Sequence, residues 1–118
     1  SEIRSQAYLE HVNLRGRNLS GRRLYGSIFR SVNLSGANLS GAGMGGSHIE
    51  DTDLSRANLR GANLSGANIN FTVLRGNNLS NANLSNADLT GIRAKFIRGC
   101  PSSLPTGWVC ENNSLIQF

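Results

Sequence analysis

The chain has 118 residues, of which 38% are hydrophobic, and it carries a formal net charge of +5. This length fits one domain, and no apolar run is long enough to cross a bilayer, so we expect a soluble protein without membrane insertion. The pI of about 10.2 permits anionic partners, but the sign of the charge alone is a weak indication of nucleic-acid binding.

An apolar residue occupies every fifth position from Leu9 to Leu89. An α-helix repeats every ~3.6 residues and a strand about every two, so only a chain that turns after each short segment can keep this spacing on one inner surface. We therefore expect a repeat protein whose interior these side chains fill. The seventeen central positions are Leu9, Leu14, Leu19, Leu24, Phe29, Leu34, Leu39, Met44, Ile49, Leu54, Leu59, Leu64, Ile69, Leu74, Leu79, Leu84 and Leu89.

Each central residue has characteristic neighbours. The residue two places before it is usually small, the residue between is most often asparagine, and Ser-Gly often follows, as at 40–41 and 65–66. Because glycine accepts a positive φ at low cost, each pentad is predicted to be a very short extended segment followed by a corner. One column of the predicted stack is expected to form a ladder of side-chain amides: Asn18, Asn38, Asn58 and Asn78.

These units resemble the A(D/N)LXX repeat of pentapeptide-repeat proteins. The resemblance rests on segments such as Ala-Asn-Leu-Ser-Gly at 37–41 and 62–66, and it covers residues 7–91. It implies an all-β solenoid, a right-handed quadrilateral β-helix with four pentads in each coil and about four coils in all. Composition and spacing by themselves predict only the pentad.

We expect three parts along the chain: a lead-in over residues 1–6, the β-helix over 7–91 and a C-terminal cap over 92–118. A cap is needed because a stacked rod exposes unpaired backbone groups at its ends. The apolar spacing within 92–98 predicts a short helix that lays Ile92, Phe96 and Ile97 over the last coil, followed by a loop.

The N-terminal end departs from the repeat in another way. Arg17 and Arg22 occupy positions that point inward elsewhere, and a buried unpaired guanidinium would cost several kcal/mol. The first coil is therefore expected to deviate, with these side chains lying over the open end or reaching Glu2 or Glu10. An anion-binding end is the alternative interpretation.

The only two cysteines, Cys100 and Cys110, both lie in the predicted cap. Their pairing would close a short loop and contribute about 2 to 3 kcal/mol, so we interpret them as a disulfide, with free thiols as the alternative. His11 and His48 lie far from them in the sequence, and no four-ligand spacing exists. We therefore expect no metal site and no other cofactor.

A disulfide favours an oxidising compartment, and the chain begins at Ser1, as a processed mature protein or a trimmed chain would. The cap, with its Leu-Pro-x-Gly-Trp stretch and bracketing cysteines, resembles those of cyanobacterial and plastid pentapeptide-repeat proteins. The resemblance implies the periplasm or the thylakoid lumen. The cytoplasm remains the alternative.

The face centred on Leu9, Phe29 and Ile49 departs most from the repeat, because aromatic, aliphatic and imidazole side chains replace asparagine in its outward column. Exposed apolar groups gathered on one side can mark a binding surface, although scattered ones are common on any protein. The candidate interaction face consists of Tyr8, Tyr25, Ile28, His48, Phe71 and Val73.

A second candidate is an anion patch, because eleven of the twelve basic residues are arginines. Such a patch could contact phosphates, but no aromatic stacking platform or recognition helix accompanies it, so a nucleic-acid partner is not expected. The candidate patch consists of Arg15, Arg17, Arg22, Arg23, Arg56 and Arg75.

Catalysis is not expected either, since no triad-like spacing links a histidine to a serine, cysteine or carboxylate. Some pentapeptide-repeat proteins mimic DNA and occupy gyrase, but those mimics are acidic, whereas this chain is basic. The sequence thus favours a rigid, non-enzymatic interaction or scaffold module whose partner is a protein. Arginine-mediated anion or nucleic-acid binding is the alternative.

Overall fold

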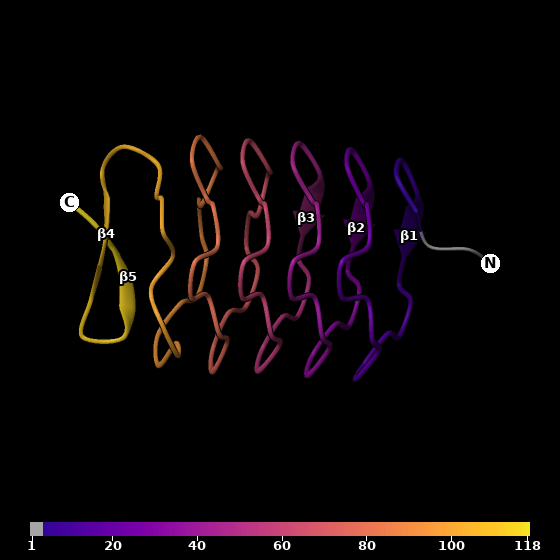
Figure 1. Ribbon diagram of the computed structural model, residues 1–118, viewed down its shortest axis with the longest axis horizontal. Helices are drawn as coiled ribbons and strands as arrows, with labels where there is room; N and C mark the ends of the chain where they lie inside the picture. Colours follow the sequence, from indigo (N-terminus) through magenta and orange to yellow (C-terminus); the bar gives the residue numbers. More distant parts are fainter. Residues whose placement is uncertain (1–3) are drawn as a thin grey trace.

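The computed structural model describes residues 4–118, which form coils stacked along one axis (Figure 1). The molecule measures 40 × 23 × 23 Å, and the first described coil and the C-terminus lie at opposite ends of the long axis. Parallel bridges join residues 20 positions apart, such as Asn38 and Asn58, so each coil takes four pentads. Glu2 and the first half of the predicted lead-in lie outside the described residues.

Three strands mark one face of the stack. Strands β1 (Tyr8–Glu10), β2 (Ile28–Arg30) and β3 (His48–Glu50) form a parallel sheet in the order β1-β2-β3. Their register pairs Leu9 with Phe29 and Phe29 with Ile49, again 20 residues apart. The other faces are joined by isolated bridges, because their extended segments are shorter.

The corners repeat one backbone conformation. Every fifth residue from 6 to 96 has a positive φ, between 51° and 71°, and ten of these residues are glycine. At a representative corner, the Ala37 N–H donates to the Leu34 carbonyl over 3.0 Å, and Gly36 has a φ of 68°. A positive φ at the third residue is what a type II turn requires, so the recurrent glycine has a geometric cause.

The asparagine before each central residue stabilises the following corner. Its Oδ1 accepts the backbone N–H two residues on, as from Ser65 to Asn63 over 3.0 Å, an Asx turn that asparagine and aspartate both support. In the column predicted as an amide ladder, the backbone forms the bridges between coils, while each amide oxygen bonds within its own corner. At Asp88, the hydroxyl and N–H of Thr90 hold the carboxyl pKa below its usual value.

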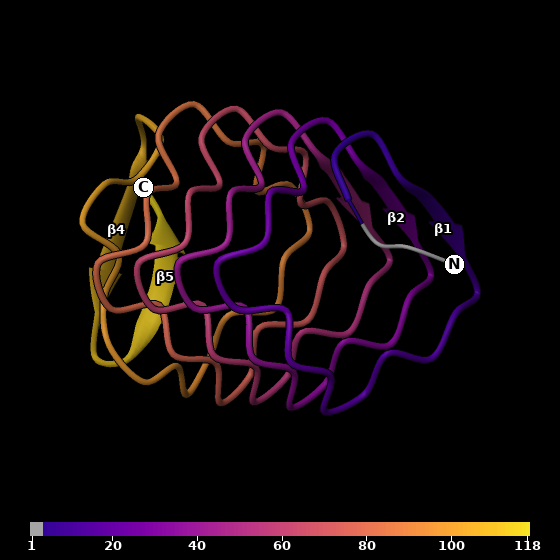
Figure 2. The same ribbon diagram turned by 45° about the vertical axis from the view of Figure 1, so that its right-hand side comes forward.

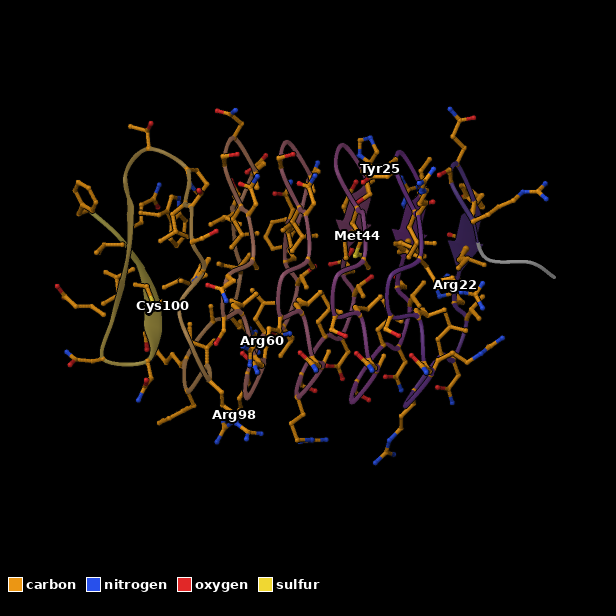
Figure 3. The ribbon with its side chains drawn as sticks, viewed as in Figure 1. Arg22, Tyr25, Met44, Arg60, Arg98 and Cys100 are labelled. Atoms are coloured by element: carbon orange, nitrogen blue, oxygen red, sulfur yellow. A yellow bond between two sulfur atoms is a disulfide. The ribbon has the colours of Figure 1, made fainter. Side chains whose placement is uncertain are left out.

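The predicted interior is confirmed at sixteen of the seventeen central positions, which are buried. Leu9, in the first coil, is only partly buried because no coil covers it on that side. Met44 lies in the interior, whereas Arg22 and Arg60 lie at the surface (Figure 3). Arg17 is exposed like Arg22, while the backbone of the first coil keeps the same bridges and corners as the others.

The helix predicted over 92–98 is wrong. Arg93 forms a parallel bridge with Val73, Lys95 forms an antiparallel bridge with Ser114, and Phe96 has a φ of 58°. The open edge of the preceding coil offers backbone partners that a local helix would forgo, so this segment continues the stack instead. Ile97 is buried and Ile92 packs against the core as expected, but Phe96 is 63% exposed.

A β-hairpin closes the C-terminal end of the stack (Figure 2). Strands β4 (Trp108–Glu111) and β5 (Ser114–Gln117) pair antiparallel. Asn112 and Asn113 join them, both with positive φ, as a two-residue hairpin turn of type I′ requires. The hairpin docks through the Leu115 N–H, which donates to the Ala94 carbonyl over 3.1 Å.

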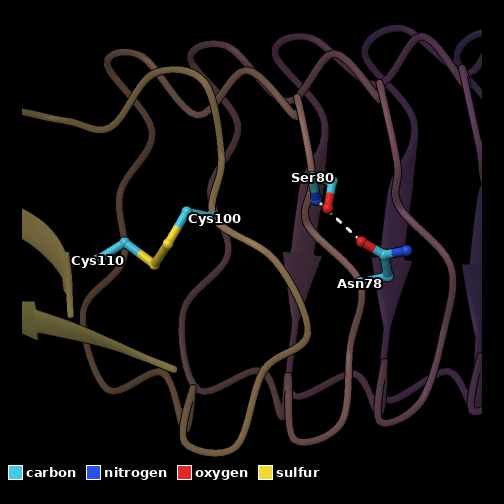
Figure 4. The surroundings of a disulfide bond; sticks show 4 residues. All are labelled: Asn78, Ser80, Cys100 and Cys110. Carbon is cyan, nitrogen blue, oxygen red and sulfur yellow. Dashed lines mark hydrogen bonds between the residues drawn. A yellow bond between two sulfur atoms is a disulfide. The ribbon is translucent and has the colours of Figure 1, made fainter. Parts of the chain in front are cut away.

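The disulfide is confirmed between Cys100 and Cys110 (Figure 4). Cys100 lies in the last part of the stack, shortly before Ser103, which bridges Asn83, and Cys110 lies in β4. The bond therefore fastens the hairpin to the solenoid. Next to Cys100, Gly99 packs closely against Ser80. A Cβ added to Gly99 would lie 2.0 Å from the serine oxygen.

We predict that Asn63→Ala lowers the free energy of unfolding by about 0.5 to 1.5 kcal/mol, because the Ser65 N–H loses its acceptor. Asn63→Asp is the matched control and should stay close to wild type, since Asp53 accepts the Ser55 N–H in the same way. Urea unfolding followed by circular dichroism measures both variants. An equal loss in the two variants would contradict the Asx-turn explanation.

We also predict that replacing both cysteines by serine lowers the free energy of unfolding by about 2 to 4 kcal/mol. The loss should be local first, because the bond holds the hairpin rather than the coils. Amide hydrogen exchange should therefore accelerate in residues 108–117 and remain slow in 34–64. Uniform acceleration along the whole chain would show that the cap is not a separate unit.

Candidate functional site

Three residues of the predicted interaction face form a continuous column. Tyr8 pairs with Ile28 and Ile28 with His48 across the sheet of β1, β2 and β3. Tyr8 is 59% exposed, His48 is exposed and Ile28 is half-buried. The column therefore presents an aromatic, an aliphatic and an imidazole group side by side on the strand face.

Carboxylates flank this column at both ends. The Tyr8 hydroxyl donates to Glu10 Oε1 over 3.2 Å, and His48 Nδ1 lies 3.8 Å from Glu50 Oε1. Arg30 lies between the two glutamates in the neighbouring column. The face thus combines apolar contact area with a charged rim that alternates in sign, an arrangement common at protein interfaces.

Tyr25 has a packing role that sequence reasoning missed. A Cβ built on Gly43 would lie 2.3 Å from two atoms of the tyrosine, and one on Gly45 would lie 3.5 Å from its ring. The ring therefore covers the backbone of the next coil where two side chains are missing. The signal was present in the sequence, since Gly43 and Gly45 replace the asparagine and serine of the regular repeat.

Phe71 and Val73 lie away from the column of Tyr8, Ile28 and His48. Phe71 occupies a corner with a φ of 57°, and its ring lies over Gly91, where a Cβ would be 2.4 Å away. Val73 belongs to the following face, in the column that bridges Asp53 and Arg93. The six predicted residues are thus distributed over two faces and the corners beside them.

The predicted anion patch is divided along the stack. Arg15, Arg17, Arg22 and Arg23 belong to the first coil, whereas Arg56 and Arg75 lie two and three coils further on. Arg15 and Arg75 share a column, but Ser35 and Ser55 separate them. The Arg56 side chain lies over Gly76, beside Arg75.

A groove of about 450 Å³ lies where the last coil meets the hairpin. Val73, Ile92, Ala94 and Leu115 line it with apolar surface, and Arg75, Arg93, Lys95 and Phe96 complete its wall. Sequence reasoning missed this groove because its lining depends on the hairpin. The available signal was Arg93, a cation in a column that otherwise holds asparagine, aspartate and valine.

Residues 4–118 contain no group of three histidine, cysteine, aspartate or glutamate side chains that could hold a metal ion. Over the same range, no helix is long and apolar enough to cross a membrane. The two histidines each lie beside a glutamate, with His11 Nε2 3.7 Å from Glu10 Oε2. The chemistry that these surfaces offer is therefore contact, charge and hydrogen bonding.

Comparisons with solved structures give relatives of the same architecture. A pentapeptide repeat protein from the Arabidopsis thaliana thylakoid lumen is 33% identical, with a TM-score of 0.63, over 69% of this chain and 60% of that protein. A pentapeptide repeat protein from Nostoc is 25% identical, with a TM-score of 0.47, over 90% and 93% of the two chains. HetL from Nostoc, described as involved in regulating heterocyst differentiation, is 29% identical, with a TM-score of 0.44, over 80% and 45%.

A search of curated proteins gives no significant match. The family model described as pentapeptide repeats (8 copies) matches over residues 7–46 and again over residues 47–91. This match covers most of the chain and agrees with the pentad, the corners and the four-pentad coil. The chain therefore belongs to the pentapeptide-repeat family, a family of right-handed β-helix solenoids.

Proposed function

We propose that this chain is a rigid, non-enzymatic protein-interaction module that binds a protein partner through the column of Tyr8, Ile28 and His48. The observation that carries the proposal is the replacement of the repeat's asparagine on the strand face by Tyr8 and His48, which are exposed, and by Ile28, which is half-buried. Pentapeptide-repeat proteins generally serve as structural or interaction modules, and this column is where the chain departs from a purely structural lattice.

Rigidity supports such a role. The N–H and C=O groups of successive coils are bonded at 2.6 to 3.1 Å along the stack, so the column is held in place before any partner arrives. A preorganised surface loses less conformational entropy on binding than a flexible one. Apolar contact area framed by Glu10, Arg30 and Glu50 would give affinity at the centre and orientation at the rim.

We also propose that the protein is located in an oxidising compartment, such as the thylakoid lumen or the periplasm. The disulfide between Cys100 and Cys110 supports it, because such bonds persist mainly outside reducing compartments. The relative from the thylakoid lumen is consistent with this location.

Arginine-mediated anion or nucleic-acid binding is the second candidate, favoured by the net charge of +5. The separation of the first-coil arginines from Arg56 and Arg75 weakens it, because neither group forms a continuous track for a phosphate backbone. A DNA mimic acting on gyrase is disfavoured, since a basic rod would be repelled by a DNA-binding surface.

We predict that Tyr8→Asn together with Ile28→Asn abolishes capture of a protein partner from an extract of the native compartment. Asparagine is the residue that the repeat itself places in this column, at Asn68, so the solenoid should stay folded. Arg60→Gln, on another face, is the matched control and should capture the partner as wild type does. Mass spectrometry identifies what each protein retains.

Salt separates the two candidate functions. Apolar contact should resist high salt, whereas arginine–phosphate contact should weaken steeply with it. Recovery of the same proteins by wild type and the double variant would refute the column as a binding site. Recovery of nucleic acid that high salt removes would favour the second candidate.

A further inference from the structure

We propose that the groove between the last coil and the hairpin binds a small amphipathic anion, a phosphate or carboxylate group carried on an apolar body. This site is independent of the column proposed above for a protein partner. Its volume of about 450 Å³ lies within the range of small-ligand sites, roughly 300 to 1,000 Å³. Leu115 of β5 forms one wall, so the site exists only where the cap meets the stack.

The charges around the groove are all positive. Arg75, Arg93 and Lys95 contribute guanidinium or ammonium groups, and no carboxylate is part of the lining. Within residues 4–118, none of these three cations forms an ion pair. The nearest acid of the same column, Asp53, lies one coil before Val73 and accepts the Ser55 N–H. Three uncompensated cations therefore favour an anion.

The apolar floor of the groove indicates that the ligand carries an apolar body beside its anionic group. Val73, Ile92, Ala94 and Leu115 provide apolar contact surface, and Ala94 and Leu115 are themselves buried. A fully hydrated inorganic ion would leave this surface uncovered. An apolar body attached to the anionic group would cover it and gain the free energy of removing both surfaces from water.

Phe96 gives an independent reason to regard the groove as functional. It occupies a corner position with a φ of 58°, where the equivalent residues of other coils include Gly16, Gly36 and Gly76. A bulky side chain in this conformation costs free energy, and its ring is 63% exposed. The ring instead supports Arg75, whose guanidinium carbon lies 4.9 Å from the ring centroid, and so orients a cation at the groove.

The hairpin holds the groove in shape. The Leu115 N–H donates to Ala94 over 3.1 Å, and the Ile97 N–H donates to Asn113 over 2.9 Å. These bonds flank Phe96 on both sides along the chain. The wall that carries the cations and the wall that carries Leu115 are therefore fixed relative to each other before a ligand binds.

The test is an NMR titration of the oxidised full chain with phenyl phosphate, inorganic phosphate and phenol. We expect phenyl phosphate to shift the amides of residues 92–96 and 115 in a saturable way, about tenfold more tightly than inorganic phosphate. Phenol should give no saturable shift. Equal affinity for the two phosphates, or saturable binding of phenol, would overturn the proposal.

Substitutions in and away from the groove test whether phenyl phosphate binds there. Arg93→Gln and Lys95→Gln should each weaken phenyl phosphate binding at least about fivefold, whereas Arg60→Gln should leave it unchanged. Phe96→Gly should weaken binding while the melting temperature stays the same or rises, which a merely structural role for Phe96 would not produce. Equal losses for Arg60→Gln and Arg93→Gln, or shifts that follow the N-terminal arginines, would refute the groove as the site.

Discussion

The backbone hydrogen bonds between coils are the constraint on which the rest of this structure depends. The Leu39 N–H donates to the Asn58 carbonyl over 2.7 Å, and the Asn58 N–H donates to the Ala37 carbonyl over 2.9 Å. This pattern recurs along the stack with a register of 20 residues. If one corner gained or lost a residue, the central side chains beyond it would leave the interior. The register therefore requires identical corners, and identical corners require a positive φ at every fifth residue.

Two residue types in the repeat stabilise those corners. Glycine makes the positive φ inexpensive, and the asparagine or aspartate three residues earlier accepts an N–H within the same turn. Corners without glycine have a different use. Phe71 extends its side chain over Gly91, Arg56 lies over Gly76, and Phe96 supports Arg75. At these three corners the chain accepts backbone strain and places a large side chain outside the lattice, whereas other corners without glycine hold Ser31, Asp51, Asn81 or Asn86.

The C-terminal end of the solenoid is where unpaired backbone of the last coil is covered. There, a disulfide-fastened hairpin packs on the coil and creates the groove. Along the coils, most outward positions hold the repeat's own polar residues, and Tyr8 in the first coil and Ile28 in the second replace them. A protein built in this way gains binding surfaces by local replacement and by capping, without altering its core.

The sequence by itself determined the pentad, the buried central residues, the small residues beside them and the cysteine pair, because these follow from a period that only one kind of chain path can satisfy. It predicted the wrong structure for residues 92–98: their apolar spacing fits a helix, and only the open edge of the preceding coil decided for β-bridges at Arg93 and Lys95. It also grouped residues by composition. The stack separated Phe71 and Val73 from Tyr8, because a shift of two positions around a corner changes the face on which a side chain lies, and it separated Arg15 from Arg75 by placing other coils between them in one column. The groove required tertiary structure for the same reason, since Leu115 and Val73 meet only when the hairpin folds back onto the coil.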